Sequence, residues 1–326
     1  MTRYPAWKKH QIRDSWKSLI SIFLTITLLF AVFNGLSKGF WLKDKIKSGK
    51  WDGRGPIALI IEGKSPAVFV YQKDSKRLVS LALDADASYE TGREEKPFVK
   101  LSARNDAGDS LVSSVSKILG ANITSYATLK NKIVVDELKS QNLFKKFASI
   151  WTPLLLLTVG VRDDIQETNI TRYDAFKLWW QLKTLGTKDI AFKDLSGFSE
   201  EIIALDGQKV LGADSESLNK EVGKYLEDFQ LVSENYDISI ENQSGKTQAA
   251  KLATNFIKSV GGNVVDVQNS KSVASTTSII SSKKNSYTSA YLAKLFNCDI
   301  NDAQNLGKER QITIILGQDF VNYWYR

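Results

Sequence analysis

The longest apolar stretch of the chain lies near its beginning, from Ser18 to Leu36, and its nineteen residues include no charged side chain. A helix of this length, at about 1.5 Å per residue, covers the roughly 30 Å hydrocarbon thickness of a bilayer. The stretch exceeds the apolar core of a secretory signal peptide, and no small-x-small cleavage pattern follows it. The pattern therefore predicts a transmembrane helix over residues 18–37, after an N-terminal tail of residues 1–17.

The basic residues that flank this stretch leave its orientation open. Positive charges favour the cytoplasmic side of a membrane. Five precede the stretch and five follow it: Arg3, Lys8, Lys9, Arg13 and Lys17 before, Lys38, Lys43, Lys45, Lys47 and Lys50 after. Residues 38–55 form a basic juxtamembrane linker, which could be attracted to anionic lipid or anionic polymer, or could be a solvated stalk.

After Pro56 the apolar residues occur in short runs typical of strands. IALIIEG, AVFVYQ and LVSLAL each predict a strand, and the charged turn KDSKR joins the last two into a hairpin. Residues 88–109 are polar and predict a long connection. In SLVSSVSKIL the apolar residues share one helical face, so we predict a helix over residues 110–119 that Gly120 ends. Residues 123–129 are compatible with a returning strand.

Two apolar segments in the middle of the chain allow more than one interpretation. The run WTPLLLLTVGV contains Pro153, which breaks a single long helix, and the run could line a lipid pocket or fill a core. Residues 171–174 are similar to a capping box and open the helix AFKLWWQLKTLG, which Gly186 ends. Within this helix Trp179 falls on the apolar stripe, so core packing explains the pair Trp179–Trp180 better than a ligand platform does.

Residues 234–326 alternate strand and helix patterns. YDISIEN predicts a strand, GKTQAAKLATNFIKSV a helix capped by Ser244, and NVVDVQN a second strand, which together make a βαβ unit with a right-handed crossover. TTSIISS, SAYLAKLFN and QITIILG predict a further strand, helix and strand. Residues 245–247 are similar to part of a phosphate-binding loop, but such a loop also needs a glycine where Ile240 stands, so a helix cap explains them better. The fold class that these patterns predict is α/β.

Composition narrows the chemistry that the chain can perform. With 43% hydrophobic and 25% charged residues, the chain has a globular composition and is long enough for two domains. His10 is the only histidine and precedes the apolar stretch, which excludes Ser-His-Asp, Cys-His and histidine-metal sites from the rest of the chain. Cys298 is the only cysteine, so the chain has no intramolecular disulfide, and its apolar neighbours favour a small buried side chain over a nucleophile.

Beyond these patterns, the stretch from Tyr236 to Phe320 resembles the C-terminal module of LytR-type proteins. The shared features are an Asn-x-x-Gly turn at Asn242–Gly245, a Lys-Leu-Ala helix core at Lys251–Ala253, a Thr-Thr-x-Ile strand at Thr276–Ile279 and an I-x-I-I-L-G-x-D-F ending at Ile312–Phe320. The resemblance covers nearly the whole module and implies a small α/β domain over residues 234–326.

The middle of the chain is similar to the catalytic domain of the LytR-CpsA-Psr family. The similarity lies in the hairpin PAVFVYQKDSKRLVSLAL, the connection KLSARNDAGD, the helix and strand LVSSVSKILGANITSYATL, and the segment VRDDIQETNITRYDAFKLWWQLKTLG. It implies a central α/β domain over residues 56–232. Such proteins have a single N-terminal anchor, sit outside the cytoplasmic membrane, and transfer polyprenyl-phosphate-linked glycans onto peptidoglycan with arginines, acidic residues and Mg²⁺. The resemblance therefore implies a single-pass protein of the cell membrane with an extracytoplasmic body.

The residues that the family's chemistry needs are replaced in this chain. Where the family has Ser-x-Pro-Arg-Asp after the hairpin, residues 84–87 read Asp-Ala-Asp-Ala, which places carboxylates where a pyrophosphate would bind. A pair of like charges at about 4 Å costs roughly 4 kcal/mol at an effective dielectric of 20. The expected acidic residue near Pro66–Ala67 is also replaced, and the chain between Leu129 and Phe144 is too short for the family's arginine-rich segment. We therefore predict a shortened, degenerate domain: a pseudoenzyme with no catalytic residue and no cofactor.

The resulting function is that of a binding or scaffolding component in cell-envelope and cell-wall polymer assembly. Its expected partners are membrane lipid through the anchor, and peptidoglycan, an anionic wall polymer or envelope-assembly proteins, with no nucleic acid. One rival is an active transferase with a rebuilt site, in which Asp84, Asp86 and Glu90 hold Mg²⁺ and Lys100 and Arg104 act as cations, although a solvated acidic loop explains the same residues. The other is a membrane-bound regulator that faces the cytoplasm, which the balanced flanking charges permit.

Overall fold

The computed structural model describes residues 51–325 apart from residues 52, 54, 85, 87, 91–97, 101–107, 132, 150–151, 153–164, 204–206, 208, 214, 284 and 303–309. The described residues belong to one compact unit that begins at Trp51. The predicted tail, the transmembrane helix and most of the linker lie outside the described residues and stay predictions. Within the described part of the chain, no helix is both long and apolar enough to cross a membrane.

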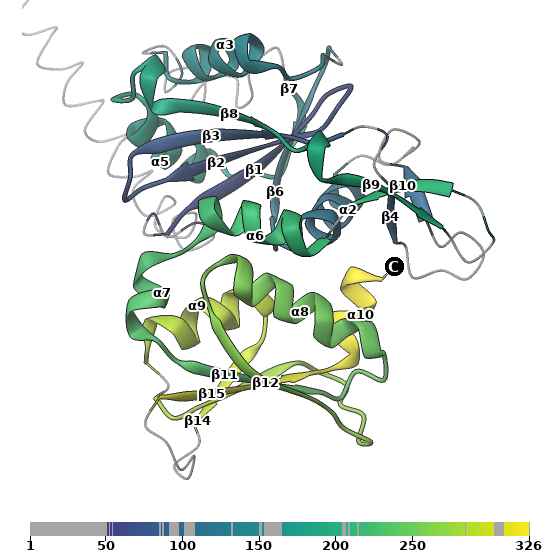
Figure 1. Cartoon of the computed structure of the whole chain (residues 1–326). Coiled ribbons are helices and arrows are strands. Elements are labelled where there is room, and N and C mark those ends of the chain that lie inside the picture. Colours follow the sequence, from purple (N-terminus) through teal and green to yellow (C-terminus); the bar gives the residue numbers. More distant parts are fainter. Residues whose placement is uncertain are drawn as a thin grey trace, which may run out of the picture. The chain divides into compact units, whose positions relative to one another are not determined.

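A six-stranded mixed sheet forms the N-terminal part of this unit (Figure 1). Its strands are β1 (Ile57–Glu62), β2 (Ala67–Gln72), β3 (Arg77–Ala82), β6 (Ser125–Leu129), β7 (Ile165–Thr168) and β8 (Ile190–Asp194). They lie in the order β7-β6-β1-β2-β3-β8. Strands β1 to β3 form an antiparallel meander, and β6 and β8 add to its two edges in parallel. The predicted hairpin is therefore confirmed.

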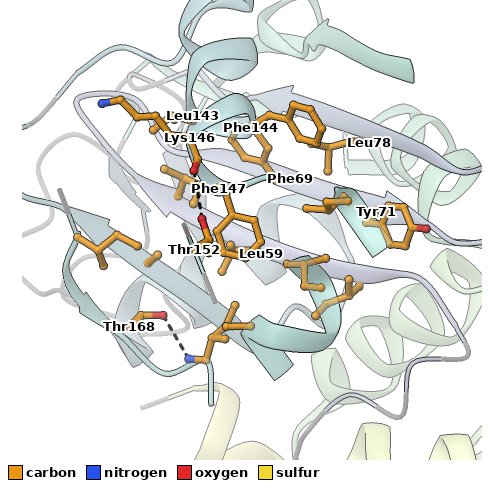
Figure 2. Close-up of a pocket in the computed structure, with 18 of the residues that line it drawn as sticks. Leu59, Phe69, Tyr71, Leu78, Leu143, Phe144, Lys146, Phe147, Thr152 and Thr168 are labelled. Atoms are coloured by element: carbon orange, nitrogen blue, oxygen red, sulfur yellow. Dashed lines mark hydrogen bonds between the residues drawn. The ribbon is translucent and has the colours of Figure 1, made fainter. Parts of the chain in front are cut away.

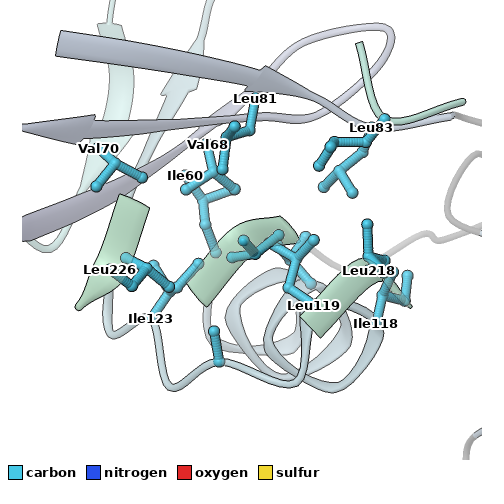
Figure 3. Close-up of a cluster of buried hydrophobic side chains, with 14 of the residues drawn as sticks. Ile60, Val68, Val70, Leu81, Leu83, Ile118, Leu119, Ile123, Leu218 and Leu226 are labelled. Atoms are coloured by element: carbon cyan, nitrogen blue, oxygen red, sulfur yellow. The ribbon is translucent and has the colours of Figure 1, made fainter. Parts of the chain in front are cut away.

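Helices cover both faces of this sheet because its strands carry apolar residues at consecutive positions. Successive side chains of a strand point to opposite faces. On β1, Ile60 belongs to a buried cluster with α2 (Asp109–Leu119) and α6 (Ser215–Leu226), which Figure 3 shows. Ile57 and Ile61 belong instead to a cluster with α3 (Glu137–Phe147) and α5 (Arg172–Leu182). The result is a layer of helices on each side of one sheet.

Two short ribbons and a short helix complete this part of the chain. Strands β4 (Ser88–Glu90) and β5 (Phe98–Lys100) pair antiparallel, and so do β9 (Ser199–Ile203) and β10 (Lys209–Ala213). Two 3-10 turns, η2 (Thr187–Asp189) and η3 (Ser196–Phe198), flank β8. Helix α7 (Phe229–Glu234) follows α6 and leads into the next sheet.

The second sheet has five strands in the order β12-β11-β15-β13-β14. Its strands are β11 (Asp237–Asn242), β12 (Asn263–Asn269), β13 (Ser278–Ser281), β14 (Asp299–Asp302) and β15 (Gln311–Leu316), with helices α8 (Thr247–Ser259), α9 (Tyr287–Phe296) and α10 (Gln318–Trp324). Strands β11 and β12 are parallel neighbours joined by α8, which confirms the predicted βαβ unit. Phe256, Phe320 and Trp324 pack together in the core of this half, with Phe256 and Trp324 ring centroids 4.7 Å apart. The chain folds as α/β in both halves.

A few polar contacts join the two halves of the unit. The Asn219 side-chain amide on α6 donates to the carbonyl oxygens of Gly120, at 2.7 Å, and of Asn255 on α8, at 3.3 Å. Gly120 has φ +59°, and a Cβ at this position would lie 2.5 Å from Asn219 Nδ2. Position 120 therefore needs glycine both for its left-handed backbone and for the close approach. Glu234 at the end of α7 accepts from the backbone amides of Tyr287, at 3.1 Å, and Thr288, at 2.7 Å, at the start of α9.

Three local predictions need correction. Residues 88–109 are not a plain connection, because β4 and β5 form a ribbon within them. The cap of α8 is Lys246 and not Ser244, because the Ser244 hydroxyl donates to Asn242 Oδ1 at 2.6 Å and accepts from the Lys246 amide at 3.2 Å in the preceding turn. Helix α5 ends at Leu182, one turn before Gly186, which starts the following 3-10 turn.

Candidate functional site

An apolar cavity of about 140 Å³ lies between the six-stranded sheet and helices α3 and α5 (Figure 2). Strands β1, β2, β3, β6 and β7 supply one wall of the cavity, and the two helices supply the other. All but four of the lining residues described are apolar or aromatic, among them Leu59, Phe69, Leu143, Phe147 and Leu178. The cavity therefore occupies the face of the sheet opposite to α2 and α6.

Bulky side chains line both walls of the cavity and face each other across it. Figure 2 shows Phe144 and Phe147 of α3 pointing toward the strands that carry Phe69 and Leu59. Residues three or four apart on a helix share one face, so α3 presents one apolar side to the sheet. The exposed side of α3 carries polar and charged residues, which keep this side in water.

Polar contacts at the edges hold the walls of the cavity in place. The hydroxyls of Ser80 on β3 and Ser140 on α3 lie 2.9 Å apart, and both side chains are fully buried. Trp179 of α5 donates from its indole Nε1 to the carbonyl oxygen of Ser149, just after α3, at 2.9 Å. The Tyr71 hydroxyl lies 3.4 Å from Gln181 Oε1, and burial, with a smaller effect of Asp74, raises the pKa of this phenol, which stays neutral. These contacts fix the separation of sheet and helices without filling the space between them.

The four polar lining residues are Lys146, Thr152, Thr168 and Arg172. Thr152 donates to the Lys146 carbonyl oxygen at 3.3 Å, and Thr168 donates to the Tyr126 carbonyl oxygen at 2.5 Å. The amino group of Lys146 points away from the cavity (Figure 2), and Arg172 is exposed on the first turn of α5. The interior is therefore apolar, with two cations at its edge. Cavities of about 150 Å³ with such linings stay dry and bind small apolar molecules such as benzene.

None of the four predicted site residues that the structure describes lines this cavity. The backbone amide of Asp86 donates to Asp84 Oδ1 at 2.8 Å, so these two residues form a turn, with Asp86 exposed. Glu90 pairs with Phe98 and Lys100 with Ser88 along the β4–β5 ribbon, which brings the two backbones near each other. Arg104 lies outside the described residues. Across the part of the chain that the structure describes, no group of three acidic, histidine or cysteine side chains forms a metal site. The assignment of these five residues stays a prediction.

Cys298 is half-buried beside the core of the second sheet. Burial raises the pKa of its thiol to about 12, with Asp319 and Asp299 adding to the shift. A thiol with this pKa is protonated at neutral pH and is a poor nucleophile. The structure therefore agrees with the interpretation of Cys298 as a small packed side chain.

The cavity itself was not predicted as a site, although one signal pointed toward it. The run WTPLLLLTVGV was interpreted as pocket lining or core, and Thr152, the one residue of this run that the structure describes, lines the cavity. The α3 residues that close the cavity were missed. Their spacing in NLFKKF, with apolar residues at 143, 144 and 147, would have indicated a helix with one apolar side.

Residues 235–320 match the family model LytR_C, described as LytR cell envelope-related transcriptional attenuator. The match falls on the stretch whose motifs resemble the LytR-type module, so the prediction of that module is confirmed. A search of curated proteins finds no match.

Several solved structures are similar to the chain at low identity. The Lin1025 protein from Listeria innocua is 13% identical, covers 53% of this chain and 97% of its own, and has a TM-score of 0.39. TagV from Bacillus subtilis is 13% identical, with 51% and 94% coverage and a TM-score of 0.38. The LytR-CPS2A-psr family protein YwtF (TagT), with bound octaprenyl pyrophosphate lipid, is 12% identical, with 54% and 92% coverage and a TM-score of 0.36. The similarity of residues 56–232 to the LytR-CpsA-Psr catalytic domain stays a prediction.

Proposed function

We propose that the protein binds the apolar part of a polyprenyl-phosphate lipid in the cavity between the sheet and helices α3 and α5, as a membrane-anchored component of cell-envelope assembly. The cavity carries this proposal, because filling an apolar space with hydrocarbon removes apolar surface from water, which is favourable. The envelope role is supported by the LytR_C match over residues 235–320. The lipid class follows from the family that the central motifs resemble.

The size of the cavity limits what it can hold. At about 140 Å³ it compares with a cavity that accommodates benzene, so it takes about one five-carbon isoprene unit. The rest of a long prenyl chain would lie outside the cavity. Arg172 and Lys146, both exposed at its edge, would supply cations for the phosphate of such a lipid.

A cavity-filling substitution tests the proposal. Ala175 of α5 lines the cavity, and Ala175→Phe would place a ring inside it. The probe is geranylgeranyl pyrophosphate, titrated into the purified full-length protein in detergent, with inorganic pyrophosphate as the probe that lacks a tail. We expect Ala175→Phe to weaken prenyl binding at least about tenfold, because the ring occupies the space of the prenyl unit.

The matched control is Ala191→Phe, the same change at an exposed position of β8. It should leave the affinity for the prenyl probe unchanged. If Ala175→Phe binds the prenyl probe as well as the unchanged protein does, or if inorganic pyrophosphate binds as tightly as the prenyl probe, the cavity is not the lipid site.

We further propose that the protein binds such lipids without transferring their glycans. Among the described residues that line the cavity there is no carboxylate, and Asp84 and Asp86 lie together in a turn outside it. Metal-dependent turnover of a polyprenyl-pyrophosphate analogue by the full-length protein, abolished by Asp86→Ala, would show that the protein is a transferase. We expect no turnover with or without Mg²⁺.

The orientation is part of the same proposal, with residues 18–37 as a membrane anchor and the body on the outer side. Protease treatment of intact cells, followed by detection of the C-terminal segment, tests this topology. We expect cleavage in intact cells and in spheroplasts. Cleavage only after lysis would place the body in the cytoplasm and favour the regulator.

A further inference from the structure

Helix α5 carries aromatic side chains on the side that faces away from the cavity. Tyr173, Phe176 and Trp180 follow one another at helical spacing and, with Trp51 and Lys177, line a shallow depression on the surface. Phe176 is 40% and Trp180 is 54% exposed. We call these five residues the α5 aromatic surface. Large aromatic side chains that gather on an exposed face indicate an interaction site.

The rings of this surface rest on a fixed base. Trp179 is buried, with 8% exposure, and its indole is hydrogen-bonded to Ser149. The ring centroids of Phe176 and Trp180 lie 5.6 Å and 6.0 Å from the Trp179 ring centroid. The two neighbouring tryptophans therefore differ in burial. Trp179 belongs to the core, as its position on the apolar stripe predicts, and Trp180 is exposed at the surface.

Lysines accompany the exposed rings. Lys183 Nζ lies 3.1 Å from the Trp180 ring centroid, and Lys177 Nζ lies 4.6 Å from the Tyr173 ring centroid. Lys177 also forms an ion pair with the buried Asp174 at 2.8 Å and donates to the Trp51 carbonyl oxygen. The surface thus combines amphipathic rings with lysines, and the carboxylate of Asp174, which pairs with Lys177, is buried beneath it.

We propose that the α5 aromatic surface docks onto the headgroup layer of an anionic bilayer. Trp and Tyr rings favour this layer because one end of each ring system is apolar and the other is polar. Each lysine near an anionic membrane surface adds about 1 kcal/mol of attraction.

The length of the chain supports this partner. Trp51 belongs to the α5 aromatic surface, and residues 38–50 separate it from the predicted transmembrane helix. Thirteen residues span at most about 45 Å when fully extended. The predicted anchor therefore keeps this surface within a short distance of the membrane.

Docking would also explain how a small cavity can bind a lipid with a long prenyl chain. This explanation rests on the proposed function. The opposite side of α5, with Ala175, Leu178 and Leu182, lines the cavity. The Tyr71–Gln181 contact joins a cavity residue to a residue of the depression. A single helix thus separates the cavity from the docked surface, so the cavity can take one end of a prenyl chain whose remainder stays in the bilayer.

A depth measurement tests the docking. The full-length protein, with Cys298→Ala and Thr184→Cys, is labelled with bimane at position 184, which is exposed just after α5 and leaves Trp180 in place. The protein is placed in nanodiscs that contain phosphatidylglycerol and lipids with a doxyl quencher near the headgroup. We expect quenching at least about threefold stronger than for the same label on Val273→Cys, a residue that is 58% exposed in the second half. Equal quenching at the two positions would overturn the proposal.

Substitutions assign the effect to the rings. Phe176→Ser with Trp180→Ser should reduce quenching at position 184 to the level at position 273, whereas Tyr323→Ser, an exposed aromatic residue of α10, should leave it unchanged. Quenching that survives the double substitution would contradict the role of these rings. The test is separate from that of the cavity, because prenyl pyrophosphate binding is measured in detergent. In the protein with its aromatic residues unchanged, equal quenching at positions 184 and 273 with intact prenyl binding overturns the docking alone. Stronger quenching at position 184 without prenyl binding overturns the cavity proposal alone.

Discussion

The two faces of the six-stranded sheet are covered by helices in different ways. On one face, α2 and α6 pack against Ile60, Val70 and Leu81 with no exposed area left on these side chains. On the other face, α3 and α5 leave a cavity of about 140 Å³ above Leu59 and Phe69. The same strands therefore present one closely packed face and one hollow face. The packed face supports the fold and the second sheet, while the hollow face gives up packing energy at the cavity where we propose that the lipid binds.

The largest expected effect compares two neighbours on β1 that point to opposite faces. Ile60→Ala should lower the free energy of unfolding by about 3 to 4 kcal/mol, because it removes a fully buried side chain from close packing. Ile61→Ala should cost about 1 to 2 kcal/mol, because Ile61 lines an existing cavity and has fewer neighbours to lose. Urea titration of the full-length protein in detergent measures both values. Equal costs would show that the two faces are packed alike.

An intermediate effect is expected for the buried hydroxyl pair on the hollow face. Ser80→Ala should cost about 1 to 3 kcal/mol, because it leaves the Ser140 hydroxyl buried without its partner. The double substitution Ser80→Ala with Ser140→Ala should cost less than the two single costs added together. On the packed face, Ser114→Ala is the control, because the Ser110 carbonyl that Ser114 contacts is already in a helix. Additive costs in the same urea titration would mean that the pair does not hold α3 in place.

The smallest expected effect lies away from both faces, where Glu234 ties α7 to α9 of the second half. Burial by itself would raise the pKa of the Glu234 carboxyl. Hydrogen bonds from the Thr288 side chain and from the backbone amides of Thr288 and Tyr287, together with the nearby charge of Lys283, have the larger combined effect. The pKa of Glu234 is therefore lowered from its usual value of 4.5. As the pH falls, the Glu234 carboxylate is therefore protonated in the unfolded chain at a higher pH than in the folded protein. The stabilisation is complete above about pH 4.5 and is lost as the pH drops through the lowered folded-state pKa.

Glu234→Gln should accordingly lower the melting temperature at pH 7 slightly, and the difference from the unchanged protein should shrink as the pH falls below about 4.5. Thermal unfolding followed by circular dichroism across this pH range measures the difference. Glu200→Gln, at an exposed position of β9, is the control and should produce no such pH dependence. Prenyl binding in the cavity should be unaffected by Glu234→Gln, and a loss of binding would mean that the α7–α9 contact and the cavity are coupled.

Much of the fold follows from local patterns in the sequence. The helix over residues 110–119 ends at Gly120 as predicted, since its apolar face and a left-handed glycine are both visible in the sequence. The capping residue Thr171 is likewise confirmed, because its hydroxyl accepts from the Asp174 amide at 3.0 Å. In the second half, strand and helix patterns alternate with regular spacing, so the βαβ unit follows from the sequence alone.

The hollow face did not follow from the sequence, because a cavity depends on distances between elements and not on any one segment. Helix α3 is mostly polar, with Ser140 and Phe144 as its buried residues, so its apolar face is narrow. The ribbon of β4 and β5 depends on the pairing of two three-residue strands, which carry little pattern of their own. The α5 aromatic surface was partly visible, because the apolar stripe already indicated that Trp179 points inward. The sequence alone could not show that Trp180 gathers with Trp51, Tyr173 and Phe176 around one depression.

The hydrogen bonds around Gly120 bear on how the C-terminal module could be moved between proteins. Asn219 of α6 donates hydrogen bonds to the end of α2 and to α8. One turn later, α6 also lies close to α8, because a Cβ at Gly223 would be 3.7 Å from the backbone of Ser259. A chimera that took only the residues from β11 onward would uncover this flank of α8 and leave its polar contacts without partners. Helix α6 lies well upstream of the point where the family match starts, and its Leu218 and Val222 are buried against the six-stranded sheet, so the two halves share this helix.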